Sequence, residues 1–142
     1  MPQRLEGSKA RKVNFVTLSV CEEEAGRKIV DAAYAVHKEL GPGLLESVYE
    51  TCLCHELTER GCSVRRQVKI PVLYKGIEFS EGLRLDVLVD DLVICELKAV
   101  DEMHNTWQAQ ILSHMKLTGK HLGYLINFNV PLIKNGIWRF IR

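Results

Sequence analysis

The chain has 142 residues, 46% of them hydrophobic, which suits one globular domain with a substantial core. Its 19 lysines and arginines nearly balance its 18 acidic residues, so bulk charge directs the protein to neither nucleic acid nor a membrane surface. No apolar run approaches the roughly 20 residues that span a bilayer, and the basic N-terminus has no apolar signal core behind it. We therefore expect a soluble, cytoplasmic protein without a membrane partner, in which any contact with DNA comes from a local patch.

The five cysteines favour reduced, mostly buried thiols. Their number is odd, they lie within otherwise apolar patterns, and no pair has the CxxC spacing of a zinc site. We therefore expect neither a disulfide framework nor a zinc centre.

An N-terminal arm is expected ahead of one domain. Residues 1–20 mix polar, basic and apolar types without a sustained period, so we expect an arm that is at most partly ordered. From Glu22 apolar residues recur at helical spacing as far as Leu40, where Gly41-Pro42-Gly43 stops the helix. The domain is placed at residues 21–142.

A second helix is expected from about Leu44 to Arg60, with Gly61 as its C-terminal stop. The connection to the first helix is short, so the two helices should be antiparallel neighbours. The inward side chains of the second helix are expected to be Leu45, Val48, Cys52 and Leu53.

Alternating apolar residues then predict strands. The run from Val64 to Val72 leads to a turn signal at Tyr74-Lys75-Gly76 and a returning strand from Ile77. The stretch from Leu83 to Val100 indicates two strands around a turn at residues 89–92. Its odd positions are all apolar and mark one buried face: Leu83, Leu85, Val87, Val89, Val93, Cys95 and Leu97.

A third helix spans roughly His104 to Leu117, with an apolar stripe that runs through Trp107 and Met115. An apolar strand at 122–130 and an alternating one at 137–141 follow it. The element order is ααβββαββ, which indicates an α/β domain.

The even positions of the central strands carry groups suited to phosphodiester hydrolysis. Asp86 and Glu96 are hard oxygen donors for a divalent metal such as magnesium, and Lys98 adds an ammonium. Side chains alternate along a strand, so Asp86 joins the other two only in one register. A two-residue turn would set Asp86 opposite Cys95, whereas a three-residue loop centred on Asp91 sets it opposite Glu96. We expect the second register, because only there do the apolar odd positions share the buried side.

A simpler interpretation is that these three residues line a solvated sheet face, where Asp, Glu and Lys are common. The apolar run Val93-Ile94-Cys95 argues against it, because it suggests a central strand buried on both faces. A carboxylate such as Glu96 is costly there unless it has a function. Geometry alone leaves both interpretations open.

Two motifs resemble a known family. Asp86, Glu96 and Lys98 resemble the D…ExK signature of the PD-(D/E)xK nuclease superfamily, and Gly43-Leu44-Leu45-Glu46-Ser47-Val48-Tyr49 resembles the motif of its GxxExxY protein family. The likeness covers about Glu22 to Arg142. It implies a restriction-endonuclease-like fold, with a mixed central β-sheet flanked by helices. It also implies a nuclease that uses Mg²⁺, or Mn²⁺ in its place, and cleaves DNA rather than RNA.

The resemblance further implies roles for individual residues. Asp86 and Glu96 become metal ligands, and Lys98 positions the attacking water. The main-chain carbonyl of Leu97 and the carboxylate of Glu46 complete the metal site. The alternative for Glu46 is a helix N-terminal glutamate that only interacts with the helix dipole.

Gln110 resembles the glutamine of the QxxxY motif of exonuclease-like branches, although His114 stands where that motif has tyrosine. We assign Gln110 to the catalytic group. Nucleic-acid contacts are assigned to Tyr49, His114 and Lys116. The alternative for His114 is a helix residue without a role, and scattered basic residues such as Lys116 usually only keep a surface solvated.

A metal-dependent deoxyribonuclease is the leading hypothesis. The alternative is a non-catalytic nucleic-acid-binding or partner-binding module that keeps the fold, which the small size and weak net charge favour. The intact acidic pair and lysine argue against such a module. Metal binding that depends on Asp86 and Glu96 would discriminate between the two, and a homodimer or a protein partner is compatible with either.

Overall fold

The computed structural model describes residues 16–142, apart from the side chain of Glu81. The elements follow the expected order ααβββαββ, with a 3-10 helix, η1, added before the last strand. Residues 1–15 of the expected N-terminal arm lie outside the described part. The bounds are α1 Val20–Leu40, α2 Glu46–Glu59, β1 Val64–Tyr74, β2 Ile77–Val89, β3 Val93–Lys98, α3 Asn105–Thr118, β4 Leu122–Asn127, η1 Ile133–Gly136 and β5 Ile137–Ile141.

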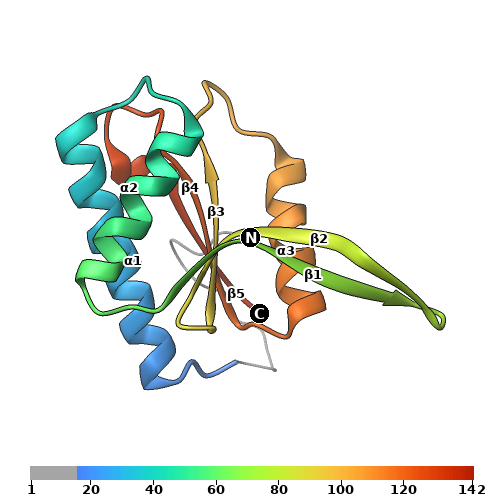
Figure 1. Ribbon diagram of the computed structural model, residues 1–142. Helices are drawn as coiled ribbons and strands as arrows, with labels where there is room; N and C mark the ends of the chain where they lie inside the picture. The colour runs from blue at the N-terminus through green and yellow to red at the C-terminus, as the bar shows by residue number, and fades with distance from the viewer. Residues whose placement is uncertain (1–15) are drawn as a thin grey trace.

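Five strands form one mixed sheet between two layers of helices. The strand order is β1-β2-β3-β4-β5, with β3 and β4 parallel and the other neighbouring pairs antiparallel. Helices α1 and α2 cover one face, and α3, which connects the two parallel strands, covers the other (Figure 1). The central strand is β3, and its residues from Val93 to Leu97 are buried. This confirms the expected central strand with two covered faces and a mixed sheet flanked by helices.

Helix α1 begins at Val20, two residues earlier than expected, because Ser19 caps it. The Ser19 hydroxyl accepts a hydrogen bond from the amide of Glu22, and the Glu22 carboxylate accepts one from the amide of Ser19. The helix ends before Gly41, whose φ of 68° is favourable for glycine. Val20 is therefore the first residue of α1.

The buried face of α2 differs from the expected one. Leu45 is the N-cap and is 74% exposed, and Val48 is 37% exposed, so the prediction that they point inward is wrong. The helix has apolar residues on two sides, and spacing alone does not decide which side packs. The inward side is the one whose polar members find partners in the fold, and it consists of Tyr49, Glu50, Leu53, Cys54 and Leu57.

The register between β2 and β3 is the expected one. A three-residue connection, in which Asp90 and Asp91 both have a φ of 55°, pairs Val89 with Val93 and Val87 with Cys95. Continuing this register places Asp86 opposite Glu96. The acidic pair therefore lies on one side of the sheet, as the pattern of apolar odd positions predicted.

The expectation that all apolar odd positions share one face is wrong for Leu83 and Leu85. Val87 packs beneath α1 and α2, whereas Leu83 and Leu85 pack with Ile94 on the α3 side. The alternation of β2 therefore breaks before Asp86. Beyond this break, the β1–β2 hairpin projects past the body of the sheet toward α3 (Figure 1).

All five cysteines lie in the described part and are free thiols, three of them buried. Burial raises the pKa of Cys54 to about 11, so its thiol is protonated and unreactive near neutral pH. These findings agree with the expected buried thiols. No helix within residues 16–142 has the length and apolar character needed to cross a membrane.

Candidate active site

A polar cavity of about 390 Å³ lies between α3, the start of α2 and the strands β2 and β3. Its lining contains six of the site residues expected from the sequence: Glu46, Asp86, Glu96, Lys98, Gln110 and His114. A larger hollow of about 690 Å³ beside α1 is mainly apolar and holds one carboxylate, that of Asp31. The smaller cavity is therefore the candidate for chemistry that needs several carboxylates.

The two central carboxylates are held by contacts within the domain. Oδ2 of Asp86 accepts a hydrogen bond of 2.9 Å from the amide of Leu97. Glu96 is only 6% exposed, and its Oε2 lies 3.1 Å from Nδ1 of His114 on α3. His114 of α3 thus lies with the acidic residues of β2 and β3 at the cavity. Spacing along the chain did not predict its contact with Glu96.

Negative charge at the cavity is only partly compensated. Burial raises the pKa of Glu96 to about 7; the hydrogen bond with His114 opposes this shift, and the Asp86 carboxylate adds to it. Burial also raises the pKa of Glu46, with a further contribution from Asp86, while Lys98 lowers it. The Asp86 carboxylate therefore contributes to the raised pKa of both glutamates in this cavity.

The ammonium of Lys98 points toward α3. Its Nζ lies 4.5 Å from the centre of the Trp107 ring, close enough for a cation–π interaction. Trp107 is half-buried against the cluster formed by α3 and the sheet, as expected for a core residue. The ring restricts the rotamers of a long side chain and keeps its charge beside the carboxylates.

These groups fit a magnesium ion. Among residues 16–142, no three His, Cys, Asp or Glu side chains converge closely enough to hold a metal unaided. Magnesium often binds through one or two carboxylates and keeps several waters, so Asp86 and Glu96 suffice as protein donors. Burial is the main cause of the raised pKa of Glu96, and a bound cation would favour the charged form of this carboxylate. The Leu97 side chain packs on the opposite face, so only its main chain can take part.

Two of the expected nucleic-acid contacts lie outside this cavity lining. Tyr49 is fully buried, its ring stacks on Phe128 at 4.6 Å, and its hydroxyl donates to the carbonyl of Gly41 and accepts from the amide of Leu44. The assignment of Tyr49 to nucleic-acid contact is therefore corrected to a structural role in the α1–α2 connection. Lys116 is an exposed residue of α3.

Replacing Tyr49 by phenylalanine is expected to lower the free energy of unfolding by about 1–3 kcal/mol, because two main-chain groups lose a hydrogen-bond partner. Urea denaturation measures the change. A matched change at the exposed Tyr34, also to phenylalanine, is expected to have little effect. Equal stability of the two variants would contradict the structural role.

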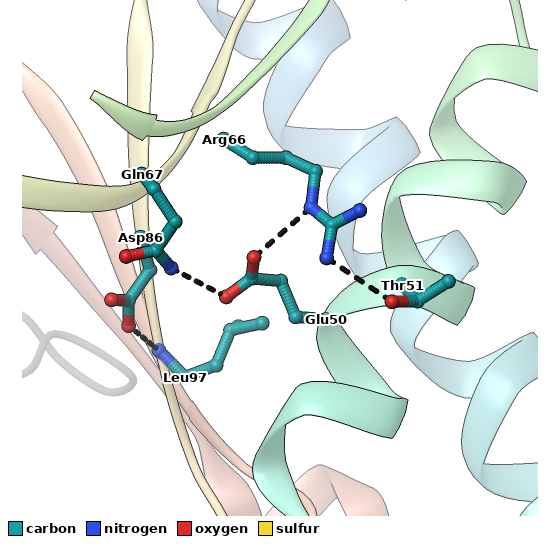
Figure 2. A network of polar contacts seen from close by, with 6 residues as sticks. All are labelled: Glu50, Thr51, Arg66, Gln67, Asp86 and Leu97. Carbon is teal, nitrogen blue, oxygen red and sulfur yellow. Dashed lines mark hydrogen bonds and ion pairs between the residues drawn. The ribbon is translucent and has the colours of Figure 1, made fainter.

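Sequence reasoning missed two charged residues near the cavity. Arg84 lines it from β2, but its spacing of two from Asp86 was not a usable signal, because the alternation of β2 breaks between these two residues. Glu50 is 6% exposed and belongs to a polar network beside Asp86, which Figure 2 shows with Arg66 and Gln67. Its position one helical turn after Glu46 was a weak signal, because exposed glutamates are common on helices.

Comparison with known proteins supports the family. The sequence profile of the PD-(D/E)XK nuclease superfamily matches residues 23–140. Comparison with curated proteins and with solved structures found no match. Members of the superfamily are typically nucleases, which act on nucleic acid and generally use a divalent metal. With the profile match extending over nearly all of the described residues, and with the acidic pair and the lysine of its signature lining one cavity, this chain belongs to the PD-(D/E)XK nuclease superfamily.

Proposed function

We propose that this protein is a magnesium-dependent nuclease that hydrolyses phosphodiester bonds, with DNA as its preferred substrate and Mn²⁺ able to replace Mg²⁺. The observation that carries the proposal is the cavity in which Asp86, Glu96 and Lys98 meet Glu46 and Gln110. The preference for DNA rests on the resemblance of Asp86, Glu96 and Lys98 to the signature of the PD-(D/E)xK nuclease superfamily.

Each residue has a proposed task. Asp86 and Glu96 hold the metal, with Glu46 and the carbonyl of Leu97 as further donors. A bound divalent cation supplies an acidified water and neutralises charge on the phosphoryl oxygens. The ammonium of Lys98 orients the water and stabilises the charge that develops on the phosphate.

The rim of the cavity supplies further polar groups. Gln110 offers an amide that can hydrogen-bond the water or a phosphate oxygen, and His114 holds the carboxylate of Glu96 in place. Arg84 offers a guanidinium suited to bidentate contact with a phosphate. Lys116, on the same helix as His114, is proposed to contact a more distant phosphate.

We also assign the chain to the GxxExxY protein family, on the segment from Gly43 to Tyr49, and place the nuclease domain at residues 21–142. The buried hydroxyl of Tyr49 hydrogen-bonds Leu44, at the start of this segment, and Gly41, just before it, which gives the tyrosine of the motif a physical purpose. Free thiols agree with work in the reducing cytoplasm.

Calorimetric titration with Mn²⁺ tests the proposal. The wild-type protein is expected to bind the ion, and Asp86→Asn is expected to weaken binding roughly 10- to 100-fold, because a charged oxygen donor is lost. Asp31→Asn is the matched control, since Asp31 is exposed on α1 and lines the other hollow. Equal binding by the wild type and Asp86→Asn would contradict the site. Absence of binding by the wild type would favour the non-catalytic module.

A further inference from the structure

The paired strands β1 and β2 break their alternation at the same place. Arg66 and Gln67 follow one another in β1, yet both side chains reach Glu50 on α2 (Figure 2). In a regular strand, neighbouring residues point to opposite faces. On β2, Leu85 packs in the α3-side cluster and its neighbour Asp86 also lies on the α3 side, in the cavity. The position between the paired residues Arg66 and Val87, and Val68 and Leu85, is occupied by Gln67 and Asp86.

The break requires an unfavourable backbone conformation at Gln67. Its φ is 51°, in the left-handed region that non-glycine residues rarely adopt. Such a conformation costs free energy and persists where the surrounding structure holds it in place, often at functional sites. The contacts of Gln67 therefore indicate what maintains the break.

Glu50 supplies those contacts. It is buried, and both of its oxygens are used: Oε2 accepts from Nε of Arg66 at 3.0 Å, and Oε1 accepts from Nε2 of Gln67 at 2.9 Å. The Arg66 guanidinium also donates to the hydroxyl of Thr51, the next residue of α2. One carboxylate thus fastens two successive residues of β1 to one turn of α2 (Figure 2).

The same carboxylate relates the two sides of the cavity. Glu46 lies one turn before Glu50 on α2, and Asp86 lies opposite Gln67 on β2. Because Asp86 sits at the break, its carboxylate can accept a hydrogen bond from the amide of Leu97 on β3. In a regular ladder, that amide would donate to a main-chain carbonyl instead. Both oxygens of Glu50 are hydrogen-bonded to β1, and Glu50 is not part of the cavity lining.

We propose that Glu50 is a positioning residue for this site, which through Arg66 and Gln67 maintains the break that directs Asp86 into the cavity. The inference rests on the proposed function for its catalytic meaning. Its structural part concerns the Asp86 to Leu97 hydrogen bond and stands independently of metal binding.

The first experiment compares Glu50→Gln with Glu56→Gln in the full-length protein. Both glutamates lie on α2 and pair with an arginine, but Glu56 pairs within its own helix with Arg60. Glu50→Gln is expected to shift the Leu97 amide resonance, to speed its hydrogen exchange in metal-free protein, and to weaken Mn²⁺ binding about 10-fold. Glu56→Gln is expected to leave all three unchanged.

Each outcome of this comparison bears on the inference. A Leu97 amide that does not move in Glu50→Gln overturns it, as does wild-type Mn²⁺ affinity in a variant whose Leu97 amide has moved. If the wild-type protein binds no Mn²⁺, the proposed function fails, and the Leu97 amide alone decides the role of Glu50.

A second pair of variants covers the case in which Glu50→Gln does not fold. Both Gln67→Gly and Gln67→Ala remove the contact with Glu50, but only glycine accepts the positive φ at low cost. The urea midpoint is therefore expected to be higher for the glycine variant, and its Leu97 amide to stay closer to the wild-type position. In a strand interior, a protein with alanine is normally more stable than one with glycine. A higher urea midpoint for Gln67→Ala than for Gln67→Gly would therefore overturn the inference.

Discussion

Replacing Asp86 by alanine is expected to reduce kcat for magnesium-dependent DNA cleavage by on the order of 1,000-fold, the upper range for the loss of one electrostatic group in an active site. Glu96→Ala and Lys98→Ala are expected to have effects of similar size. All three side chains line the same cavity, and the proposed chemistry requires negative oxygen donors and a positive charge at the same phosphate. A nuclease assay with a labelled DNA duplex or single strand measures the change.

The fold of these variants must be checked beside their activity. Circular dichroism and thermal unfolding are expected to show a folded domain for each, because the core residues are untouched. Asp31→Ala is the control, since this exposed residue of α1 is remote from the acidic pair in the sheet. Wild-type cleavage rates in all three cavity variants would remove the hydrolytic mechanism.

Metal binding is expected to depend steeply on pH because of Glu96. Its pKa is raised to about 7, chiefly by burial, so the carboxyl is largely protonated at pH 6. A metal competes with that proton, and the apparent affinity for Mn²⁺ is therefore expected to fall by about tenfold for each pH unit below about 7 and to level off above it. Calorimetric titrations at several pH values between about 5.5 and 8 measure the slope.

The metal-free protein is expected to show the opposite trend in stability. The pKa of Glu96 is about 7 in the folded state, above the ordinary glutamate value of 4.5, so its favourable contribution to stability is complete below pH 4.5 and is lost as the pH rises toward 7. Glu96→Gln removes this titration. The free energy of unfolding of Glu96→Gln, taken relative to that of the wild type, is expected to be higher at pH 8 than at pH 4.5 by on the order of 1–3 kcal/mol. Urea unfolding at both pH values measures the difference, and parallel pH profiles for the two proteins would contradict it.

The match between sequence expectation and structure is closest where one local rule decides the outcome. The register of Asp86 against Glu96 followed from apolar alternation, because a shift by one residue would have turned the buried face of a central strand toward the wrong layer. The C-terminal end of α1 followed from similar local chemistry, since Gly41 adopts a positive φ where a helix must stop. The start of α1 lies two residues before the expected one, because the side chains of Ser19 and Glu22 form a reciprocal cap there that apolar spacing does not reveal.

The expectations failed where two solutions satisfied the same pattern. Apolar residues on two sides of α2 left its inward face undecided, and Leu45 and Val48 were assigned inward although they are exposed. Burial of Glu50 selected the other side, because a carboxylate can be buried only where partners from another element meet it. Those partners lie 16 and 17 residues away in β1, beyond the range of helical spacing.

By itself the sequence determined the order of the elements, the central strand and the presence of an acidic pair with a lysine on one side of it, because periodicity and turn chemistry act over a few residues. Only the tertiary structure decided that His114 contacts Glu96, that Trp107 lies beside Lys98, and that the break at Gln67 faces Asp86. These contacts join separate layers of the fold. They depend on how helices and strands pack, and packing is set by the whole set of burial and hydrogen-bonding requirements together.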